Sequence, residues 1–217
     1  MRELLSAGRE RRFCRGDVVL AVGANPAPLM LLTSGWLMRV RLREDGNAAN
    51  VGTFLPGDVL GLEHIALPHC ADNYVALTPG TLKTTPSKDF ADLRAKAPNV
   101  LGDMVHAQAL DQHFLRQALS AIGSGTAYER LLSFLFQTRE RMIMKGMCPR
   151  SSDPALVPLT QVDLGMTIGV TSIHVNRVLR TLKEEGLCSL LHQRLIVYDE
   201  DGFGAAARRA MGLATPG

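Results

Sequence analysis

Residues 159–188, LTQVDLGMTIGVTSIHVNRVLRTLKEEGLC, predict two short amphipathic helices joined at a glycine. Thr160 is suited to cap the first helix, and Asp163 stands at the third helical position, where a carboxylate caps in return. Gly169 permits a sharp turn, and Thr171 is suited to cap the second helix. Two helices joined by so short a turn form a helix-turn-helix, whose second helix can enter the major groove of DNA.

The second helix of this pair has one apolar side and one polar side. Apolar residues from Val175 to Leu182 repeat at helical spacing and predict the buried side. On the polar side, Arg177 can donate two hydrogen bonds to a guanine edge, and Asn176 suits an adenine. Further along, Lys183 stands where DNA phosphates would pass. The DNA-contacting residues predicted on this helix are Thr171, Ser172, Ile173, His174, Asn176, Arg177, Arg180 and Lys183.

Residues 187–201, LCSLLHQRLIVYDED, predict two short strands around His192 and Gln193. Such a hairpin is a wing, and its His192 and Arg194 are placed to touch the DNA backbone. A packed helical pair with a solvated basic face would show the same pattern. An effector-binding interaction module that does not bind DNA is therefore the alternative interpretation.

Residues 13–85 show a different pattern, in which short runs of residues that favour β-strands are separated by turn residues. The Asp45-Gly46 pair predicts a tight hairpin, because glycine adopts positive φ at little cost. Further turns are predicted at Gly16-Asp17 and Gly57-Asp58. This spacing favours an antiparallel sandwich or jelly roll.

From about residue 97 the pattern becomes helical, and one long helix to residue 122 carries two stripes. A helix with two such stripes needs two partners, here its own domain and a second subunit; the alternative is a helix buried within a monomer. The break at 123–125, GSG, predicts domains at 1–122 and 123–217. The first stripe is Leu101, Val105, Gln108, Gln112, Leu115, Leu119 and Ile122, and the second is Met104, Ala107, Phe114 and Ala118.

Composition excludes several classes of protein. The longest apolar runs, such as residues 27–32, are far shorter than the ~20 residues that cross a bilayer. The N-terminus lacks the apolar segment of a signal peptide, so we expect a cytoplasmic protein without a membrane partner. The formal charge of +3 permits nucleic-acid binding without indicating it. An enzyme has the weakest support, since the sequence contains no phosphate-binding glycine loop, G-x-S-x-G or H-E-x-x-H motif and suggests no catalytic residues.

The stretches IGSGTAYERLLSFL, GVTSIHVNRVLRTLKEEGL, SGWLMRV and FLPGDVLGL resemble the Crp/Fnr superfamily of bacterial transcription regulators. The H-V-N-R sequence is similar to the FixK-type branch. The resemblance implies an α+β chain: an N-terminal jelly-roll sensor domain of the cyclic-nucleotide-binding type, a long dimerisation helix and a C-terminal winged helix-turn-helix. It also implies a homodimer on a palindromic double-stranded DNA operator, with RNA polymerase as a further partner.

The resemblance assigns base reading to Ser172, Ile173, Asn176 and Arg177. Ile173 stands where the family commonly has glutamate. Isoleucine cannot accept a hydrogen bond from cytosine, but it can contact the methyl group of thymine. TTGA-like half-sites are the resulting expectation.

The sensor domain departs from the family pattern. Leu62 falls where cyclic-nucleotide-binding members have the glutamate that holds the ribose, and Cys70-Ala71-Asp72-Asn73 replaces the segment with the phosphate-binding arginine. We therefore expect no cyclic AMP binding in the usual way. Cys14 stands alone rather than in the cysteine cluster of the oxygen-sensing branch, so no iron-sulfur cofactor, and no cofactor of any kind, is expected.

Other cysteines and histidines have two interpretations each. Cys188, after the second helix, is a candidate redox switch if basic neighbours lower its pKa, or else a small buried apolar residue. The set His64, His69 and Cys70 could ligate a haem or metal, and His106 and His113 share a helix face and could meet symmetry mates or line an effector cavity. For both histidine sets the alternative is ordinary surface or core histidines, and no metal site is predicted.

Overall fold

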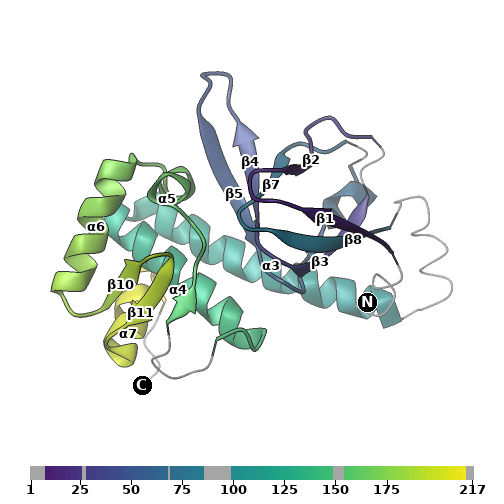
Figure 1. Ribbon diagram of the computed structural model, residues 1–217. Coiled ribbons are helices and arrows are strands. Elements are labelled where there is room, and N and C mark those ends of the chain that lie inside the picture. The colour runs from purple at the N-terminus through teal and green to yellow at the C-terminus, as the bar shows by residue number, and fades with distance from the viewer. Residues whose placement is uncertain (1–7, 26–27, 68, 86–98, 149–153, 214–217) are drawn as a thin grey trace. The chain divides into compact units, whose positions relative to one another are not determined.

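The computed structural model describes residues 8–25, 28–67, 69–85, 99–148 and 154–213 (Figure 1). The chain divides into two compact units, residues 1–111 and 112–217. The N-terminal unit is rich in strands, and the C-terminal unit consists of helices and one small sheet. The predicted α+β class and the order of its parts are confirmed.

Two four-stranded antiparallel sheets form the N-terminal unit, as the jelly-roll prediction required. Their strand orders are β1-β8-β3-β6 and β2-β7-β4-β5. A short 3-10 helix, η1 (Leu62–Ile65), follows β6. The strands are β1 (Arg9–Phe13), β2 (Val18–Leu20), β3 (Leu29–Ser34), β4 (Leu37–Leu42), β5 (Ala48–Phe54), β6 (Val59–Leu60), β7 (Asn73–Ala76) and β8 (Gly80–Thr85).

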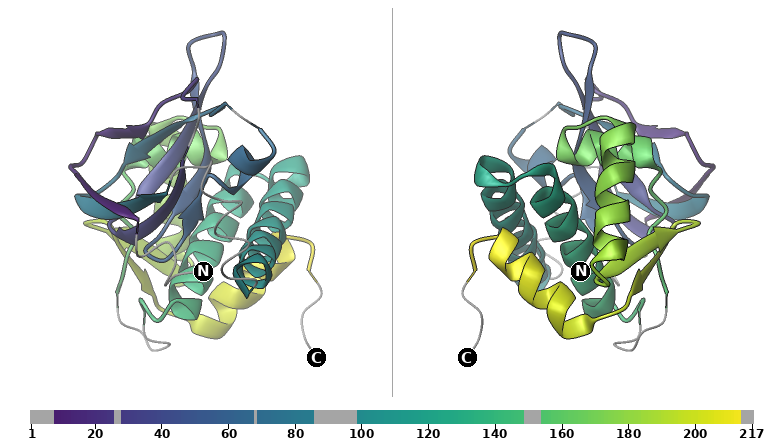
Figure 2. Two further views of the ribbon diagram at one scale, coloured as in Figure 1. Left: turned by 90° about the vertical axis from the view of Figure 1, so that its right-hand side faces the viewer. Right: turned by 90° about the vertical axis from the view of Figure 1, so that its left-hand side faces the viewer.

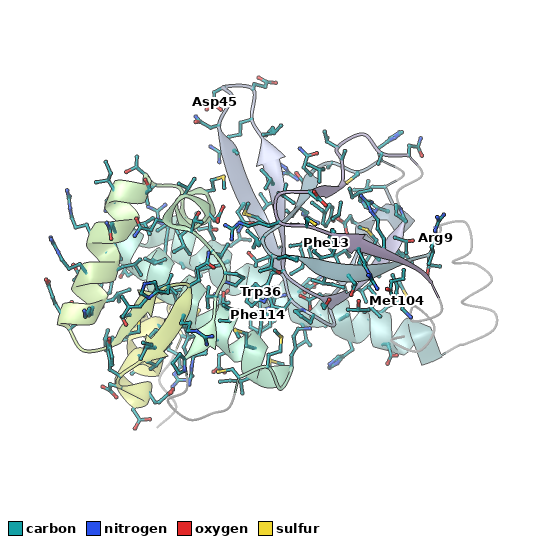
Figure 3. The ribbon with its side chains drawn as sticks, in the orientation of Figure 1. Arg9, Phe13, Trp36, Asp45, Met104 and Phe114 are labelled. Atoms are coloured by element: carbon teal, nitrogen blue, oxygen red, sulfur yellow. The ribbon has the colours of Figure 1, made fainter. Side chains whose placement is uncertain are left out.

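The core of this unit lies between the two sheets. Leu32 and Leu82 come from one sheet, Leu37 and Tyr74 come from the other, and all four are fully buried. Phe13, which Figure 3 labels at the end of β1, belongs to the same cluster. Along β3, Met30 and Leu32 belong to this core while Leu29 and Leu31 belong to a second cluster, as the period of two along a strand requires.

The predicted hairpin at Asp45-Gly46 joins β4 to β5, and Figure 3 shows Asp45 at its tip. Gly46 has a φ of 79°, and the backbone N–H of Asn47 donates to Asp45 Oδ1 at 2.9 Å. Glycine accepts this left-handed backbone at no steric cost. The predicted hairpin is confirmed, but Asp45 lacks a positive φ and the Gly46 N–H donates to the Arg43 carbonyl, so the loop is not the two-residue primed turn typical of an Asp-Gly pair.

Helix α3 (Asn99–Ser124) begins within the predicted range and continues two positions beyond residue 122, through Gly123 to Ser124. Residues 97 and 98 of the expected helix lie outside the described residues. The two compact units divide within α3, at 111/112. The reason is packing of the C-terminal part of α3 within the second unit, where Phe114 lies against the Arg141 guanidinium at 5.7 Å.

The C-terminal unit is built around α4 (Ala127–Met144), which packs against α5, α6 and α7. Thr126 and Glu129 form a capping box at its start, and the chain turns at Gly146 after its end. The remaining elements are β9 (Ala155–Leu156), α5 (Gln161–Ile168), α6 (Ser172–Glu184), β10 (Cys188–Leu191), β11 (Arg194–Val197) and α7 (Glu200–Ala210).

Two of these elements were not predicted. Strand β9 has two residues and pairs antiparallel with β11. Helix α7 has the signals of a helix: Asp199 caps its first turn, and Arg208 and Arg209 stand in its last turn, where they complement the helix dipole. Phe203 of α7 packs on Phe136 of α4, with ring centroids 5.9 Å apart.

Candidate functional site

The helices α5 and α6 both start at a side-chain cap. Thr160 caps α5, and the Asp163 carboxylate accepts from the Thr160 backbone N–H at 2.8 Å, which completes a capping box. Thr171 caps α6 by accepting from the His174 N–H at 3.4 Å. The predicted helix starts are confirmed, and they place the first turn of α6 at the surface.

The turn between the helices depends on two glycines. Gly169 ends α5 with a φ of 73°, the conformation that was predicted for it. Gly165 was not predicted to matter, yet a Cβ at this position would lie 2.6 Å from the carbonyl oxygen of Val170. Its missing side chain lets α5 approach the turn closely and sets the geometry of the pair.

Helix α6 buries one side and exposes the other, and the right-hand view of Figure 2 shows it along the surface of its unit. Val175, Val178, Leu179 and Leu182 are buried. Burial of this stripe orients the helix, because rotating it would expose apolar surface at ~25 cal/mol per Å². Of the predicted DNA-contacting residues, Ser172 is half-buried, and the exposed ones are Thr171, Ile173, His174, Asn176, Arg177, Arg180 and Lys183.

The structure brings Ile173, Asn176, Arg177 and Arg180 together around a shallow hollow of about 330 Å³. Ile173 is 74% exposed, so its side chain is free to contact a methyl group. Arg177 has no ion-pair partner among the described residues. Arg180 Nε lies 3.7 Å from Glu184 Oε1, in an exposed pair that contributes little to stability. The hollow therefore combines an apolar contact, an amide and a free guanidinium, the groups that read bases in a major groove.

The predicted wing is confirmed as the hairpin of β10 and β11, in which Leu191 pairs with Arg194. His192 and Gln193 at its tip have φ of 49° and 62°, as a primed two-residue turn requires. His192 and Arg194 are both exposed. Pairing with β9 makes the wing part of a three-stranded sheet, which the sequence did not indicate.

Two side chains outside the predicted set hold α6 from its flanks. Gln161 of α5 donates from Nε2 to Asn176 Oδ1 at 3.2 Å. At the other end, the Tyr128 hydroxyl of α4 donates to the carboxylate of Glu185, the residue that ends α6. Burial, and then the Glu185 carboxylate, raise the pKa of Tyr128, so this hydroxyl keeps its proton and its donor role.

The structure corrects the reactive interpretation of Cys188. Its side chain is fully buried, and burial raises the pKa of the thiol to about 12, the opposite of the direction that a redox switch needs. No basic side chain contributes to this shift. Cys188 therefore fits the alternative, a small apolar residue in the core of the winged domain.

We expect Cys188 to be inert in the native protein. Its thiolate is the reactive form, and at pH 8 a pKa near 12 leaves only ~0.01% of the thiol ionised. Iodoacetamide at pH 8 should alkylate exposed Cys14 while Cys188 reacts only after unfolding, as peptide mass spectrometry would show. Peroxide should leave DNA binding of a Cys14→Ser variant unchanged. Rapid alkylation of Cys188 in the folded chain would contradict this expectation.

In the sensor unit, the segment that replaces the usual phosphate-binding sequence carries a buried acid. Asp72 is 4% exposed, and its carboxylate accepts two hydrogen bonds from Arg41, at 2.7 and 3.0 Å. Arg39 Nε lies 3.3 Å from the same carboxylate. Both arginines come from β4. The segment 70–73 contains no arginine itself, but two guanidinium groups from the neighbouring strand lie beside it.

Arg39 joins a second acid on the same side of β4. Its Nη1 donates to Glu63 Oε1 at 2.6 Å, and the Tyr74 hydroxyl donates to the same oxygen at 2.7 Å. Burial alone would lower the pKa of Arg39, but Tyr74, Glu63 and Asp72 together raise it. Two guanidinium groups thus face two carboxylates, and the cluster is neutral without a ligand.

The predicted histidine and cysteine sets show no metal site. His64 is buried, and no described residue forms a hydrogen bond with either of its ring nitrogens; His69 is exposed, and Cys70 donates its S–H to the Asp72 carbonyl. Burial raises the pKa of the Cys70 thiol. In the described part of the chain, no three His, Cys, Asp or Glu side chains are arranged to hold a metal ion. On α3, His106 and His113 are both exposed, and His113 Nε2 pairs with Gln117 Nε2 at 2.9 Å.

The first predicted stripe of α3 is exposed in the single chain. Val105, Leu115, Leu119 and Ile122 are each more than half exposed, and Gln108 and Gln112 are exposed between them. The side chain of Leu101 lies outside the described residues. In the second stripe, Met104 is buried, and Ala107, Phe114 and Ala118 are half-buried. Figure 3 labels Met104 and Phe114. Burial of the first stripe within a monomer is contradicted by this exposure.

Across the described residues, none of the helices has the length and apolar character that crossing a membrane requires.

Two family models match the chain one after the other: the cyclic nucleotide-binding domain over residues 10–97 and the Crp-like helix-turn-helix domain over residues 129–205. The "Fumarate and nitrate reduction regulatory protein" of Salmonella typhimurium is 22% identical over 206 residues, which cover 95% of this chain and 81% of the relative.

Solved structures show the same fold. FixK2 from Bradyrhizobium japonicum matches with a TM-score of 0.78 at 18% identity, over 97% of this chain and 98% of that one. The CooA mutant from Carboxydothermus hydrogenoformans matches with a TM-score of 0.75 at 19% identity, over 94% and 90% of the two chains.

Proposed function

Because the chain belongs to the Crp/Fnr family of DNA-binding transcription regulators, we propose that it binds an inverted-repeat operator as a homodimer. The observation that carries the proposal is the exposed polar side of α6, on which Asn176 and an unpaired Arg177 border one hollow. In the proposed complex, the first turns of α6 face the base edges of the major groove. Two-fold symmetry would place the two copies of α6 ~34 Å apart, in successive major grooves.

The proposed contacts divide into base readers and phosphate contacts. Arg177 donates to a guanine, Asn176 contacts an adenine, and Ile173 meets a thymine methyl, which agrees with TTGA-like half-sites. Ser172 lies at the start of the same helix. Phosphate contacts come from Arg180 and Lys183 on α6, from Thr171 and His174 in its first turn, and from His192 and Arg194 on the wing.

The dimer interface is proposed along α3. The exposed stripe of Val105, Gln108, Gln112, Leu115, Leu119 and Ile122 repeats every three or four residues, as the seam of a two-stranded coiled coil does. Gln108 and Gln112 interrupt it with polar side chains that suit a specific register. On this basis we assign residues 1–122 to the sensor domain with its dimerisation helix, and residues 123–217 to DNA binding.

The sensor domain is proposed not to bind cyclic AMP in the usual way. Arg39 and Arg41, the cations nearest the Asp72 segment, are already paired with Glu63 and Asp72. A phosphate would have to displace a buried carboxylate, at a cost in desolvation and pairing. Operator binding without added nucleotide follows from this assignment. We also propose that the protein contacts RNA polymerase, is located in the cytoplasm and is not an enzyme.

Substitutions on α6 test the proposed function. Arg177→Ala is expected to cost ~1–3 kcal/mol per half-site and to relax preference at one base pair, because it removes a bidentate contact. Lys183→Ala should weaken binding to all sequences alike and reduce its salt dependence. The measurement is fluorescence anisotropy with a TTGAT-N4-ATCAA duplex and a scrambled control, with and without cyclic AMP.

The outcomes separate the candidate functions. Sequence-dependent binding without nucleotide supports the regulator proposed here. Equal losses on every duplex from Arg177→Ala would contradict its assigned role in base reading. The wild type can fail to prefer this duplex, yield no sequence from a random pool, and show no change when cyclic AMP is added. If all three results are found, the alternative of an interaction module without DNA binding is favoured.

A further inference from the structure

Asn176 is the one base-reading candidate on α6 that the described structure shows hydrogen-bonded to the neighbouring helix. The Gln161 side chain, at the first position of α5, donates from Nε2 to Asn176 Oδ1 at 3.2 Å. Both side chains are exposed, so the bond contributes little to folding and is not needed to satisfy a buried group. Its position beside the hollow of Asn176 and Arg177 points to recognition instead.

The bond has a direction that matters for recognition. A side-chain amide has one acceptor oxygen with two lone pairs and one nitrogen with two N–H groups. When Gln161 donates to one lone pair of Oδ1, the other lone pair and the Nδ2 hydrogens of Asn176 remain available. An adenine edge offers an N6 donor beside an N7 acceptor, which matches that remaining pair of groups.

We propose that Gln161 is a specificity-determining residue: by donating to Asn176 Oδ1, it holds the Asn176 amide in the orientation that accepts from adenine N6 and donates to adenine N7. Gln161 acts through Asn176 and is therefore a positioning residue. The inference rests on the proposed operator binding and deepens it. Without Gln161, the Asn176 amide is free to flip, and the flipped amide presents its oxygen to N7, where two acceptors repel each other.

The caps at the two helix starts support this role. Thr160, immediately before Gln161, and Asp163, two residues after it, anchor the start of α5, and Thr171 anchors the start of α6. The close approach at Gly165 fixes the distance between the helices. Gln161 and Asn176 therefore extend from rigid elements, which reduces the side-chain ordering that DNA binding costs.

The test compares base preference in three variants of the full-length protein. First, the operator of the wild type is selected from random duplexes, and its affinity is measured for every single-base change in a half-site. Asn176→Ala then identifies the position that Asn176 reads. We expect Gln161→Met, which keeps the length of the side chain but has no amide, to lower the preference for adenine there on the order of fivefold.

Gln161→Glu is the sharper variant. A carboxylate at this position only accepts, so the Asn176 amide turns its Nδ2 toward it and its oxygen toward the base. The adenine preference should fall further than in Gln161→Met. The added negative charge weakens binding to all duplexes by a common factor. Dividing the affinity for the adenine duplex by the affinity for each duplex changed at that position removes this factor. Val162→Ala is the matched control, because Val162 is exposed on the same helix and has no polar side-chain atoms.

The outcomes distinguish this inference from the proposed function. If the wild type selects an operator but Gln161→Met and Gln161→Glu leave the preference at the Asn176 position unchanged, the inference is wrong and the function stands. The same conclusion follows if both variants lower all affinities by one factor, or if Asn176→Ala changes no position. If the wild type selects no sequence, the proposed function itself fails.

Discussion

Replacing Leu115 and Leu119 together with glutamate is expected to convert the dimer into monomers. Both leucines are more than half exposed on the α3 stripe of the single chain. Burial of one leucine contributes ~1.5–3 kcal/mol, and a symmetric dimer would bury four of these side chains. The double substitution should therefore cost roughly 6 kcal/mol or more of dimer stability and raise the dimer dissociation constant by about 10⁴.

Sedimentation velocity would measure the mass, and anisotropy would measure operator binding. Operator affinity should fall to that of a single half-site, because a monomer has one α6. Met144→Glu is the control, since Met144 is as exposed as the two leucines but lies on α4, outside the stripe. Circular dichroism and thermal unfolding show whether each variant folds. A folded double variant that remains a dimer would exclude the proposed interface.

Replacing Asp72 with alanine has the second largest expected effect. The substitution removes the carboxylate that pairs with Arg39 and Arg41, and Arg39 is mostly buried. Breaking a buried ion pair typically costs 3–5 kcal/mol, and the exposure of Arg41 reduces this figure. We expect the free energy of unfolding to fall by about 2 kcal/mol.

The same variant should acquire an anion site. Two guanidinium groups without their carboxylate form a fork that binds phosphate oxygens. Inorganic phosphate should raise the melting temperature of Asp72→Ala relative to chloride of equal ionic strength, because a ligand that binds only the folded state stabilises it. The wild type should show no such increase. Asp45→Ala, which removes an exposed carboxylate at the hairpin tip, is the control.

Two results would contradict the assigned role of Asp72. One is an unchanged melting temperature in the variant, which would show that the ion pairs contribute nothing to stability. The other is an equal response to phosphate in Asp72→Ala, Asp45→Ala and the wild type, which would place the phosphate elsewhere.

Local sequence signals predicted much of the C-terminal unit. Thr160 with Asp163, Thr171 and Gly169 specify helix starts and a turn through contacts between residues three or four apart, and each was confirmed. The β4–β5 hairpin at Asp45-Gly46 and the wing at His192-Gln193 follow from turn chemistry in the same way. The exposed residues of α6 could be predicted because burial of one helical stripe determines what the other side exposes.

Contacts between distant residues were not predictable in this way. Arg41 and Asp72 are 31 positions apart, and only the pairing of β4 with β7 brings them together. The sequence indicated an acid without a nearby arginine, whereas the structure shows that acid between two. Similarly, Gln161 and Asn176 are 15 positions apart on different helices, and no periodicity within one helix relates them.

By itself the sequence determined the order of the parts, the helix caps and turns, the helix-turn-helix and the residues that α6 exposes, because these depend on interactions within one element or one turn. Tertiary structure alone decided the Arg39, Arg41, Glu63 and Asp72 cluster, the burial of Cys188 and the partner of Asn176. The physical reason is that charge pairing and burial depend on which elements meet in space, and that is decided by the packing of the whole unit.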